Sequence, residues 1–162
     1  MEKVYMDIVG DKVVLKPYSL EMCHAFYRKY RSDPMMTYDE YVYDLEKVNQ
    51  FYTSKVLDKS RCFFAIYSNN IIIGEIQLKR INYEEKSCAL SIHLSCDKYK
   101  GLGYGSEAEK LIIEFAKLEL RMKTIYADTV HRNSRSKHIL QKLSFIYLYD
   151  DNNLSYFKLD VL

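Results

Sequence analysis

Three glycines at alternate positions, Gly101, Gly103 and Gly105, stand directly before a helical run in a chain with only five glycines. Glycine adopts positive φ at little cost, so such a stretch can curl its backbone N–H groups toward one point. The apolar residues that follow are spaced as on one helix face; they are Ala108, Leu111, Ile112, Phe115 and Leu118. Because a helix N-terminus carries partial positive charge, the stretch predicts an anion-binding site, and phosphate is the ligand that such sites usually bind. The alternative is a turn that needs positive φ for geometry alone.

Apolar and alternating segments elsewhere predict seven strands, over 13–17, 62–68, 71–78, 87–94, 124–129, 145–149 and 154–160. Helices are expected over 19–31, with Ser19 as the N-cap, over 41–59, after the glycines, and over 133–143 behind Asn133. The segments 69–70 and 150–153 have the turn residues of hairpins. The resulting order, βααβββαβαββ, predicts a single α/β (α+β) domain over 1–162, with a mixed, mainly antiparallel twisted sheet flanked by helices.

Composition excludes several classes of protein. The chain is 48% hydrophobic and 28% charged with a net charge of +2, which fits a globular core and gives no basic footprint for nucleic acid. We expect no membrane span, because no apolar run approaches 18 residues, and no signal peptide, because the N-terminus lacks an apolar core. The four cysteines form no CxxC pair and no zinc spacing, so we expect no metal and a reduced, cytoplasmic protein.

Two familiar phosphate-binding folds fit poorly. A P-loop ends in Gly-Lys-Ser/Thr, whereas Gly105 is followed by Ser106 and Glu107. A dinucleotide fold would use Gly101-x-Gly103 with Asp128 at the end of the next strand, but its third glycine is due at Ser106. In the dinucleotide fold the turn from the strand to the first glycine is tight, whereas here residues 95–100 separate the preceding strand from Gly101.

The glycine segment resembles the pyrophosphate loop of the GNAT superfamily of acyl-CoA N-acetyltransferases. The family pattern is Gln/Arg-x-x-Gly-x-Gly/Ala, and here it reads Lys100-x-x-Gly103-x-Gly105. A second segment, 133–145, resembles the family signature Asn-x-x-Ser…Lys-Leu-Gly-Phe, with Ser144 in place of the glycine. The strand order resembles that of the family over nearly the whole chain. The closest resemblance is to the branch that acetylates the N-termini of ribosomal proteins, with spermidine acetyltransferases nearby.

The resemblance implies an acetyltransferase that moves an acetyl group directly from acetyl-CoA, its co-substrate, to an amine. The acceptor would be a protein N-terminus, a polyamine or another small cationic amine. Homodimers are common in the family, so a homodimer is open here. The alternative function is an acyl-CoA-binding sensor or interaction module without turnover.

The resemblance also assigns residues to acetyl-CoA. The pyrophosphate is expected on backbone N–H groups of the loop, which comprises Gly101, Leu102, Gly103, Tyr104, Gly105 and Ser106. Charge for the remaining phosphate is expected from Lys100 and Arg135, with Lys98 and Lys137 as further candidates; each is otherwise a solvated cation. The pantetheine arm is expected along Ile92, His93 and Leu94. Asn133 would contact it from the other side, or serve as a helix N-cap, or both.

The attacking amine must lose a proton, because alkyl amines are mostly protonated at pH 7. Glu75 is the first candidate base, on a strand where the family often places one; alternation puts it on the same face as Ile71 and Ile73. His93 is the alternative base, since histidine titrates near neutral pH. Each residue also has a non-catalytic interpretation: Glu75 as an exposed carboxylate on a strand, and His93 as a histidine packed in the core.

The departing thiolate needs a proton or a hydrogen bond. Many relatives use a Tyr seven residues after the Asn, but here that position is Leu140. Ser136 matches a Ser of the ribosomal branch and is the candidate for this contact, or else a helix cap. An acetyl-Cys intermediate on Cys96 is disfavoured, because the sequence shows no activating base.

The acceptor side is indicated by the segment 33–46, which has five acidic residues, interleaved tyrosines and no Lys or Arg. Acidic and aromatic groups together favour a cationic guest. The alternative is a solvated helix start, where acidic residues are stabilised by the helix dipole.

Overall fold

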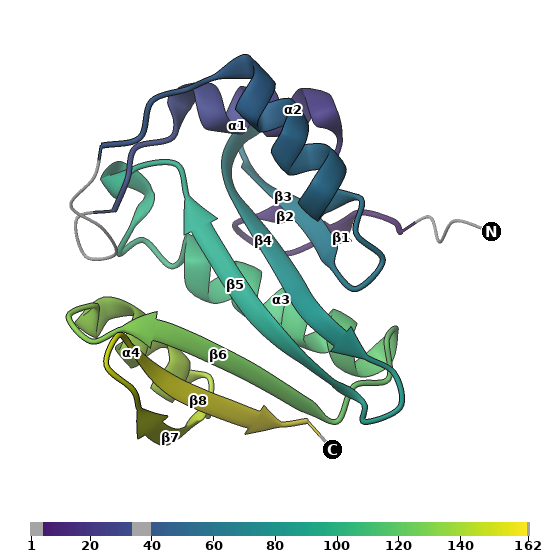
Figure 1. Cartoon of the computed structure of the whole chain (residues 1–162), viewed down its shortest axis with the longest axis vertical. Coiled ribbons are helices and arrows are strands. Elements are labelled where there is room, and N and C mark those ends of the chain that lie inside the picture. Colours follow the sequence, from purple (N-terminus) through teal and green to yellow (C-terminus); the bar gives the residue numbers. More distant parts are fainter. Residues whose placement is uncertain (1–4, 34–39, 162) are drawn as a thin grey trace.

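The computed structural model describes residues 5–33 and 40–161. Within them, eight strands form one sheet in the order β1-β2-β3-β4-β5-β6-β8-β7 (Figure 1). The strands are β1 (Ile8–Val9), β2 (Val14–Pro17), β3 (Cys62–Ser68), β4 (Ile71–Asn82), β5 (Ser87–Leu94), β6 (Thr124–Val130), β7 (Ile146–Asp150) and β8 (Leu154–Asp160). Neighbouring strands are antiparallel except β5 and β6, which are parallel.

The helices cover both faces of the sheet. They are α1 (Leu20–Lys29), α2 (Leu45–Phe51), which continues into a π-helical turn at Tyr52–Val56, α3 (Tyr104–Leu118) and α4 (Ser134–Lys142). In Figure 1, α1 and α2 lie in front of the upper sheet, and α3 lies behind it. Each start has a physical cause: the Ser19 hydroxyl accepts from Met22 N at 3.1 Å, and the Asp44 carboxylate accepts from Lys47 N at 3.0 Å.

Two apolar clusters hold these layers together. The larger one includes Phe64, Ile76, Ile112 and Leu140, and so joins α3 and α4 to one face of the sheet. The smaller one joins α1 and α2 to the other face and includes Phe26 and Val48 with strand residues of β3 and β4. The sheet is therefore buried on both faces around its centre.

The predicted order of elements is confirmed, and β1 is an addition that its two-residue length hid from the sequence. The helix expected over 41–59 is shorter, because the Asp44 cap fixes its start and the π-helical turn ends it at Val56. The first helix ends at Lys29, before the expected stop at Asp33 and Pro34, of which Pro34 lies outside the described residues. No helix in the described part of the chain is long and apolar enough to cross a membrane.

The prediction that Glu75 shares a face with Ile71 and Ile73 is wrong. The β3–β4 register shifts, so that Ile66 pairs with Gly74 while Tyr67 pairs with Ile72, and Ile73 is the extra residue of a β-bulge. Ile73 consequently packs in the larger cluster. Glu75 pairs with Ala65, which belongs to the smaller cluster, so its carboxylate points to the α1 side.

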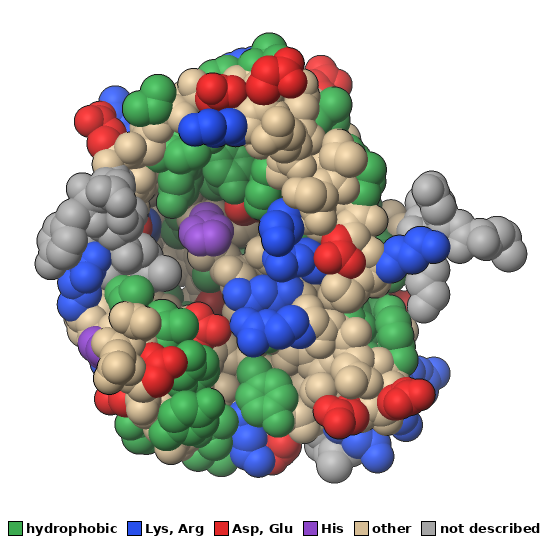
Figure 2. Space-filling view, viewed as in Figure 1, with side chains coloured by type: hydrophobic (Ala, Val, Ile, Leu, Met, Phe, Trp, Pro, Cys, Tyr) green, Lys and Arg blue, Asp and Glu red, His purple; other side chains and the backbone are tan. Residues whose placement is uncertain are grey.

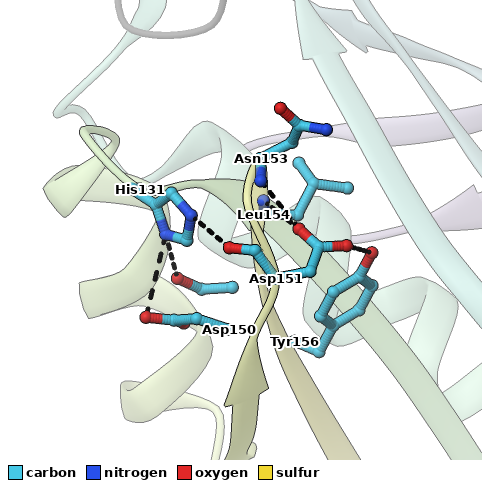
Figure 3. A network of polar contacts seen from close by, with 7 residues as sticks. His131, Asp150, Asp151, Asn153, Leu154 and Tyr156 are labelled. Atoms are coloured by element: carbon cyan, nitrogen blue, oxygen red, sulfur yellow. Dashed lines mark hydrogen bonds and ion pairs between the residues drawn. The ribbon is translucent and has the colours of Figure 1, made fainter.

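A polar network fixes the β7–β8 hairpin against the chain that leaves β6 (Figure 3). The Asp151 carboxylate accepts from Asn153 N, Leu154 N and the Tyr156 hydroxyl, at 2.8, 2.7 and 2.6 Å. His131 lies 2.9 Å from Asp151 O through Nε2. Because His131 stands two residues before Asn133, the network holds the connection from which α4 begins.

Candidate active site

A cleft opens where β5 and β6 part. Their parallel pairing covers four residue pairs, from Ser87 with Thr124 to Leu90 with Ala127, and then stops. Beyond it, the β6-facing edge of Ser91–Leu94 pairs with no strand of the described residues. Backbone N–H and C=O groups on such an edge need partners, which an extended ligand with amide groups can supply.

The cleft brings together residues far apart in the sequence. Of those expected to contact acetyl-CoA, it is lined by Ile92, His93, Leu94, Lys100, Gly105, Asn133, Arg135 and Ser136. The other expected residues are the loop and first-turn residues Gly101, Leu102, Gly103, Tyr104 and Ser106, beside the cleft at the start of α3. Figure 2 shows the hollow below the α1–α2 layer, with a histidine side chain at its rim.

The glycine loop has the backbone that the sequence predicts. Gly101 and Gly103 have φ of 75° and 87°, a region that residues with a side chain adopt at a cost. Gly103 is the N-cap of α3 and leaves that N-terminus without a side-chain cap. Gly105 has negative φ, and a Cβ there would lie 3.8 Å from Ile92 and Leu94 side chains. The loop thus presents an open helix N-terminus at one end of the cleft.

Neighbouring charges fasten this loop. The Lys100 ammonium lies 2.8 Å from the Asp33 carboxylate and 2.9 Å from that of Asp97. Lys12 Nζ donates to Leu102 O at 3.1 Å. Lys100, predicted to supply charge for a phosphate, therefore already has two carboxylate partners.

Glu107, in the first turn of α3, ties the helix start to the β1–β2 turn. Its carboxylate accepts from the backbone N–H groups of Asp11, Lys12 and Val13 at 3.2, 2.7 and 2.7 Å. These bonds to a charged acceptor are stronger than neutral ones. They occupy the carboxylate of the one acidic residue in the first turn of α3.

The start of α4 forms the opposite wall. Asn133 Oδ1 accepts from Ser136 N at 3.0 Å, so the predicted N-cap is confirmed, and both residues also line the cleft. Leu140, two turns into the helix, lines it as well and is 2% exposed. The position where many relatives have Tyr is thus an apolar part of the cleft floor.

Glu75 lies in a buried polar cluster beside the cleft. Its Oε2 accepts from the Tyr18 hydroxyl at 2.9 Å and its Oε1 from the Tyr27 hydroxyl at 2.6 Å. His93 Nδ1 lies 3.5 Å from Oε1, an ion-pair distance when the imidazole is protonated. Burial, and next the nearby Glu75 charge, raise the pKa of both tyrosines, so both stay protonated donors.

The two candidate bases differ in their exposure to the cleft. Glu75 is 2% exposed and does not line the cleft. The His93 side chain is 38% exposed and does line it. A carboxylate behind an imidazole holds the ring in one orientation and stabilises its protonated form. The pair can accept a proton at His93 with Glu75 as the supporting charge.

Sequence reasoning missed Tyr18 and Tyr27, because nothing local in the sequence pairs them with β4. It also missed Glu109 and Thr129, which line the cleft and are 5% and 1% exposed. Glu109 had a signal: it precedes Ile112, Ile113 and Ala116 at helical spacing, so a carboxyl stands on a buried apolar stripe.

Side chains of both charges lie around the cleft. Of the segment 33–46, residues 34–39 lie outside the described residues; Asp33 pairs with Lys100, and Tyr41 packs 5.1 Å from the Tyr30 ring. Across β4, Figure 2 shows Lys and Arg side chains gathered beside the hollow. Burial, the largest cause, lowers the pKa of Lys79 on β4, and the nearby Asp128 carboxylate opposes this shift.

No group of three or more His, Cys, Asp or Glu side chains in the described ranges is placed to hold a metal ion.

Comparisons with known proteins agree with this geometry. The sequence profile of the acetyltransferase (GNAT) domain matches residues 12–146. A search of curated proteins finds no match.

Solved structures share the fold at low identity. The ribosomal L7/L12 alpha-N-protein acetyltransferase RimL, in complex with coenzyme A, has a TM-score of 0.83 at 13% identity; the alignment covers 96% of this chain and 98% of RimL. A dodecameric spermidine N-acetyltransferase from Vibrio cholerae has a TM-score of 0.71 at 15% identity, covering 93% of this chain and 95% of that one. At these identities the likeness shows the fold alone.

Proposed function

This chain belongs to the GNAT acetyltransferase domain family, and from that premise we propose that it transfers the acetyl group of acetyl-CoA directly to an amine. The whole chain, 1–162, forms one N-acetyltransferase domain in this proposal. The observation that carries it is the cleft between β5 and β6, which ends at an uncapped helix N-terminus. One end fits a pyrophosphate, and the unpaired strand edge fits the amides of pantetheine.

The fit to acetyl-CoA rests on backbone groups that pair with no strand and no side-chain cap of the described residues. The edge of Ser91–Leu94 offers backbone groups to an extended arm, and the N–H groups of Gly101–Ser106 offer donors to phosphate. Arg135 at the cleft wall supplies positive charge, with Lys98 and Lys137 as further cations. Lys100 contributes through the loop position that its two ion pairs hold.

The proton of the attacking amine passes to His93, with Glu75 behind it. The near ring nitrogen, Nδ1, faces the Glu75 carboxylate at 3.5 Å, which leaves Nε2 as the proton acceptor. The hydroxyls of Tyr18 and Tyr27 hold Glu75 in place from two sides. Ser136 at the start of α4 hydrogen-bonds the departing sulfur, and backbone N–H groups of β5 polarise the thioester carbonyl.

The acceptor is a protein N-terminus, a polyamine or another small cationic amine, and the ribosomal N-terminal branch is the proposed affiliation. RimL and the spermidine enzyme represent two of these acceptor classes among the structural neighbours. Asp33 and Tyr41 favour a cationic acceptor, whereas Arg80, 3.9 Å from the cleft residue Asp128, favours an acidic residue further along a peptide.

The test is acetyl-CoA-dependent release of free CoA thiol over a panel of amines. The panel contains spermidine, aminoglycosides, free amino acids, and peptides with free N-termini followed by basic or by acidic residues. We expect release with one class only. Release with none, across the panel, would contradict the proposed reaction.

Binding without turnover is the second candidate, favoured by Leu140, which cannot donate a proton to the leaving thiolate. Calorimetric binding of acetyl-CoA with no CoA release for any acceptor would support it. Acceptor-dependent release would end it.

We also propose a homodimer through the outer strand β7. Its apolar side chains are well exposed, with Ile146 at 60%, Tyr147 at 53% and Tyr149 at 57%. Among the described strands β7 pairs with β8 alone, so its outer edge is free of other described strands and could pair with a second copy.

A further inference from the structure

Two buried side-chain oxygens in the described part of the chain have no hydrogen-bond partner, and both belong to residues of the cleft. They are Glu109 Oε2 on α3 and Thr129 Oγ1 on β6. Leaving one such group unsatisfied costs on the order of 1–3 kcal/mol, so a folded protein rarely keeps two without a use. Their common position indicates that a ligand in the cleft supplies the missing partner.

Glu109 occupies a particular place in this cleft. It lies one helical turn after Gly105, which lines the same cleft beside Ile92 and Leu94. Ile139 and Leu140 of α4 also line the cleft, and neither side chain can donate a proton. Glu109 and Thr129 are the buried residues of the cleft whose side-chain oxygens have no partner among the described residues.

Burial also keeps this carboxyl protonated. It raises the pKa of Glu109 to about 8, and burial is the only cause of the shift. The other titratable groups of the cleft are Tyr30, Asp33, His93, Lys100, Asp128 and Arg135. Four of these have partners of their own: Lys100 pairs with Asp33, His93 faces Glu75, and Asp128 lies 3.9 Å from Arg80. An ordinary thiol titrates at about 8.5, so proton transfer from such a carboxyl is nearly balanced in energy.

We propose that Glu109 is the proton donor to the departing thiolate of coenzyme A. It would take the role of the α4 tyrosine, whose position is occupied by Leu140 in this chain. This inference rests on the proposed acetyl transfer. As the amine nitrogen bonds to the acetyl carbon, the carbon–sulfur bond breaks and its electron pair goes to sulfur. Glu109 gives its proton to that sulfur, and His93 takes the proton of the amine. Solvent restores both groups after the products leave.

The decisive variant is Glu109→Gln, which keeps the size and a hydrogen-bond donor but cannot release a proton. We expect kcat to fall by at least about tenfold, while acetyl-CoA affinity measured by calorimetry changes less than about threefold. In the wild type, kcat/KM should fall on the alkaline side as Glu109 loses its proton, and the variant should lack that decline. Unchanged kcat and an unchanged pH profile would overturn the proposal.

Thr129→Val is the matched control, because it removes the other unpartnered oxygen at constant volume. It should leave the alkaline decline in place. If Thr129→Val abolishes the decline and Glu109→Gln does not, the donor is assigned to the wrong residue. An inactive wild type would instead contradict the proposed function, so the two failures are distinguishable.

A measurement without turnover tests the buried acid itself. The folded chain keeps the Glu109 proton up to about pH 8, whereas an unfolded chain loses it near pH 4.5. Stability from this group is thus complete below pH 4.5 and is lost as pH rises through 8. The unfolding free energy of Glu109→Gln, relative to wild type, should rise over this interval. A flat difference would show that Glu109 is ionised in the folded protein and overturn the proposal.

Discussion

At the scale of single residues, two buried glutamates of this protein have opposite surroundings. Glu75 receives hydrogen bonds from Tyr18 and Tyr27 and faces His93. Burial raises the pKa of Glu109, and its Oε2 has no partner in the described part of the chain. One side chain is thus arranged to support a positive imidazole, and the other to hold a proton.

If Glu75 and His93 act as one base, their effects on catalysis are not additive. Glu75→Gln and His93→Gln should each lower kcat/KM about 100-fold, and the double variant should be scarcely slower than either. Steady-state kinetics of the four proteins would measure this. Additive losses would contradict a shared role. Tyr27→Phe, which removes one hydrogen bond to Glu75, should cost less than either single variant.

Ser136 is expected to have a smaller effect. Ser136→Ala removes a hydroxyl but keeps the backbone N–H that Asn133 caps, so α4 should stay intact. Loss of one hydrogen bond to the sulfur should lower kcat by about two- to tenfold, with less change in KM. Circular dichroism checks the fold, and an unchanged kcat would remove the residue from the mechanism.

At the scale of elements, the loop before α3 depends on contacts from β1 and β2. Lys12 Nζ donates to Leu102 O, and Glu107 gathers three backbone N–H groups of the β1–β2 turn. The N-terminal hairpin thereby fixes the loop that is proposed to hold pyrophosphate.

Gly103→Val tests this loop. The residue has φ of 87°, and a Cβ there would lie 2.9 Å from Lys12 Nζ, so valine is both strained and crowded. We expect acetyl-CoA affinity to fall by well over tenfold, with the protein still folded, since a positive φ costs about 1–2 kcal/mol per residue. Calorimetry and circular dichroism provide the measurements.

Gly101→Ala is the control for Gly103→Val. It shares the positive φ, but its Cβ would meet nothing within 4 Å, so its loss of affinity should be smaller. Normal affinity in Gly103→Val would show that the loop is not the phosphate site.

Local sequence pattern predicted the elements better than their pairing. Residue type and spacing, which act over a few positions, predicted the strands at Cys62–Ser68 and Ser87–Leu94. They also predicted the helix caps at Ser19 and Asn133. The β4 bulge did not follow, because Ile71–Ile73 is apolar on both faces and leaves alternation ambiguous.

The candidate site divides in the same way. The glycine loop was predictable, since positive φ restricts the residue type. The contacts of Glu75 with Tyr18 and Tyr27 join residues 57 and 48 positions apart, and no local rule specifies such partners.

At the scale of the whole molecule, helices cover both faces of the sheet, but its outer strands are not equally protected from solvent. The β7 strand is exposed along its whole length. A monomer gains nothing from exposed isoleucine and tyrosine side chains on an edge strand, whereas a second copy could cover them.

Ile146→Lys should therefore convert the proposed homodimer to a monomer, because a charge would be buried in the interface. Light scattering coupled to gel filtration measures the mass. Ile71→Lys on β4 is the control, since Ile71 is also exposed, at 47%, and lies far from β7 in the sheet order. A wild-type monomer, or a dimer that survives Ile146→Lys, would contradict the proposal.

The parting of β5 and β6 also has a mechanical consequence. In the described chain, four residue pairs of β5 and β6 are the only strand pairing between the half-sheet β1–β5 and the half-sheet β6–β8, which we call the two plates. The two plates are therefore joined at one end only. A ligand that lies in the open end would add a second set of contacts between them. Amide hydrogens of Ser91–Leu94 and of Asp128–Val130 should then exchange more slowly once the cleft is filled, and the two plates should unfold as one unit rather than separately.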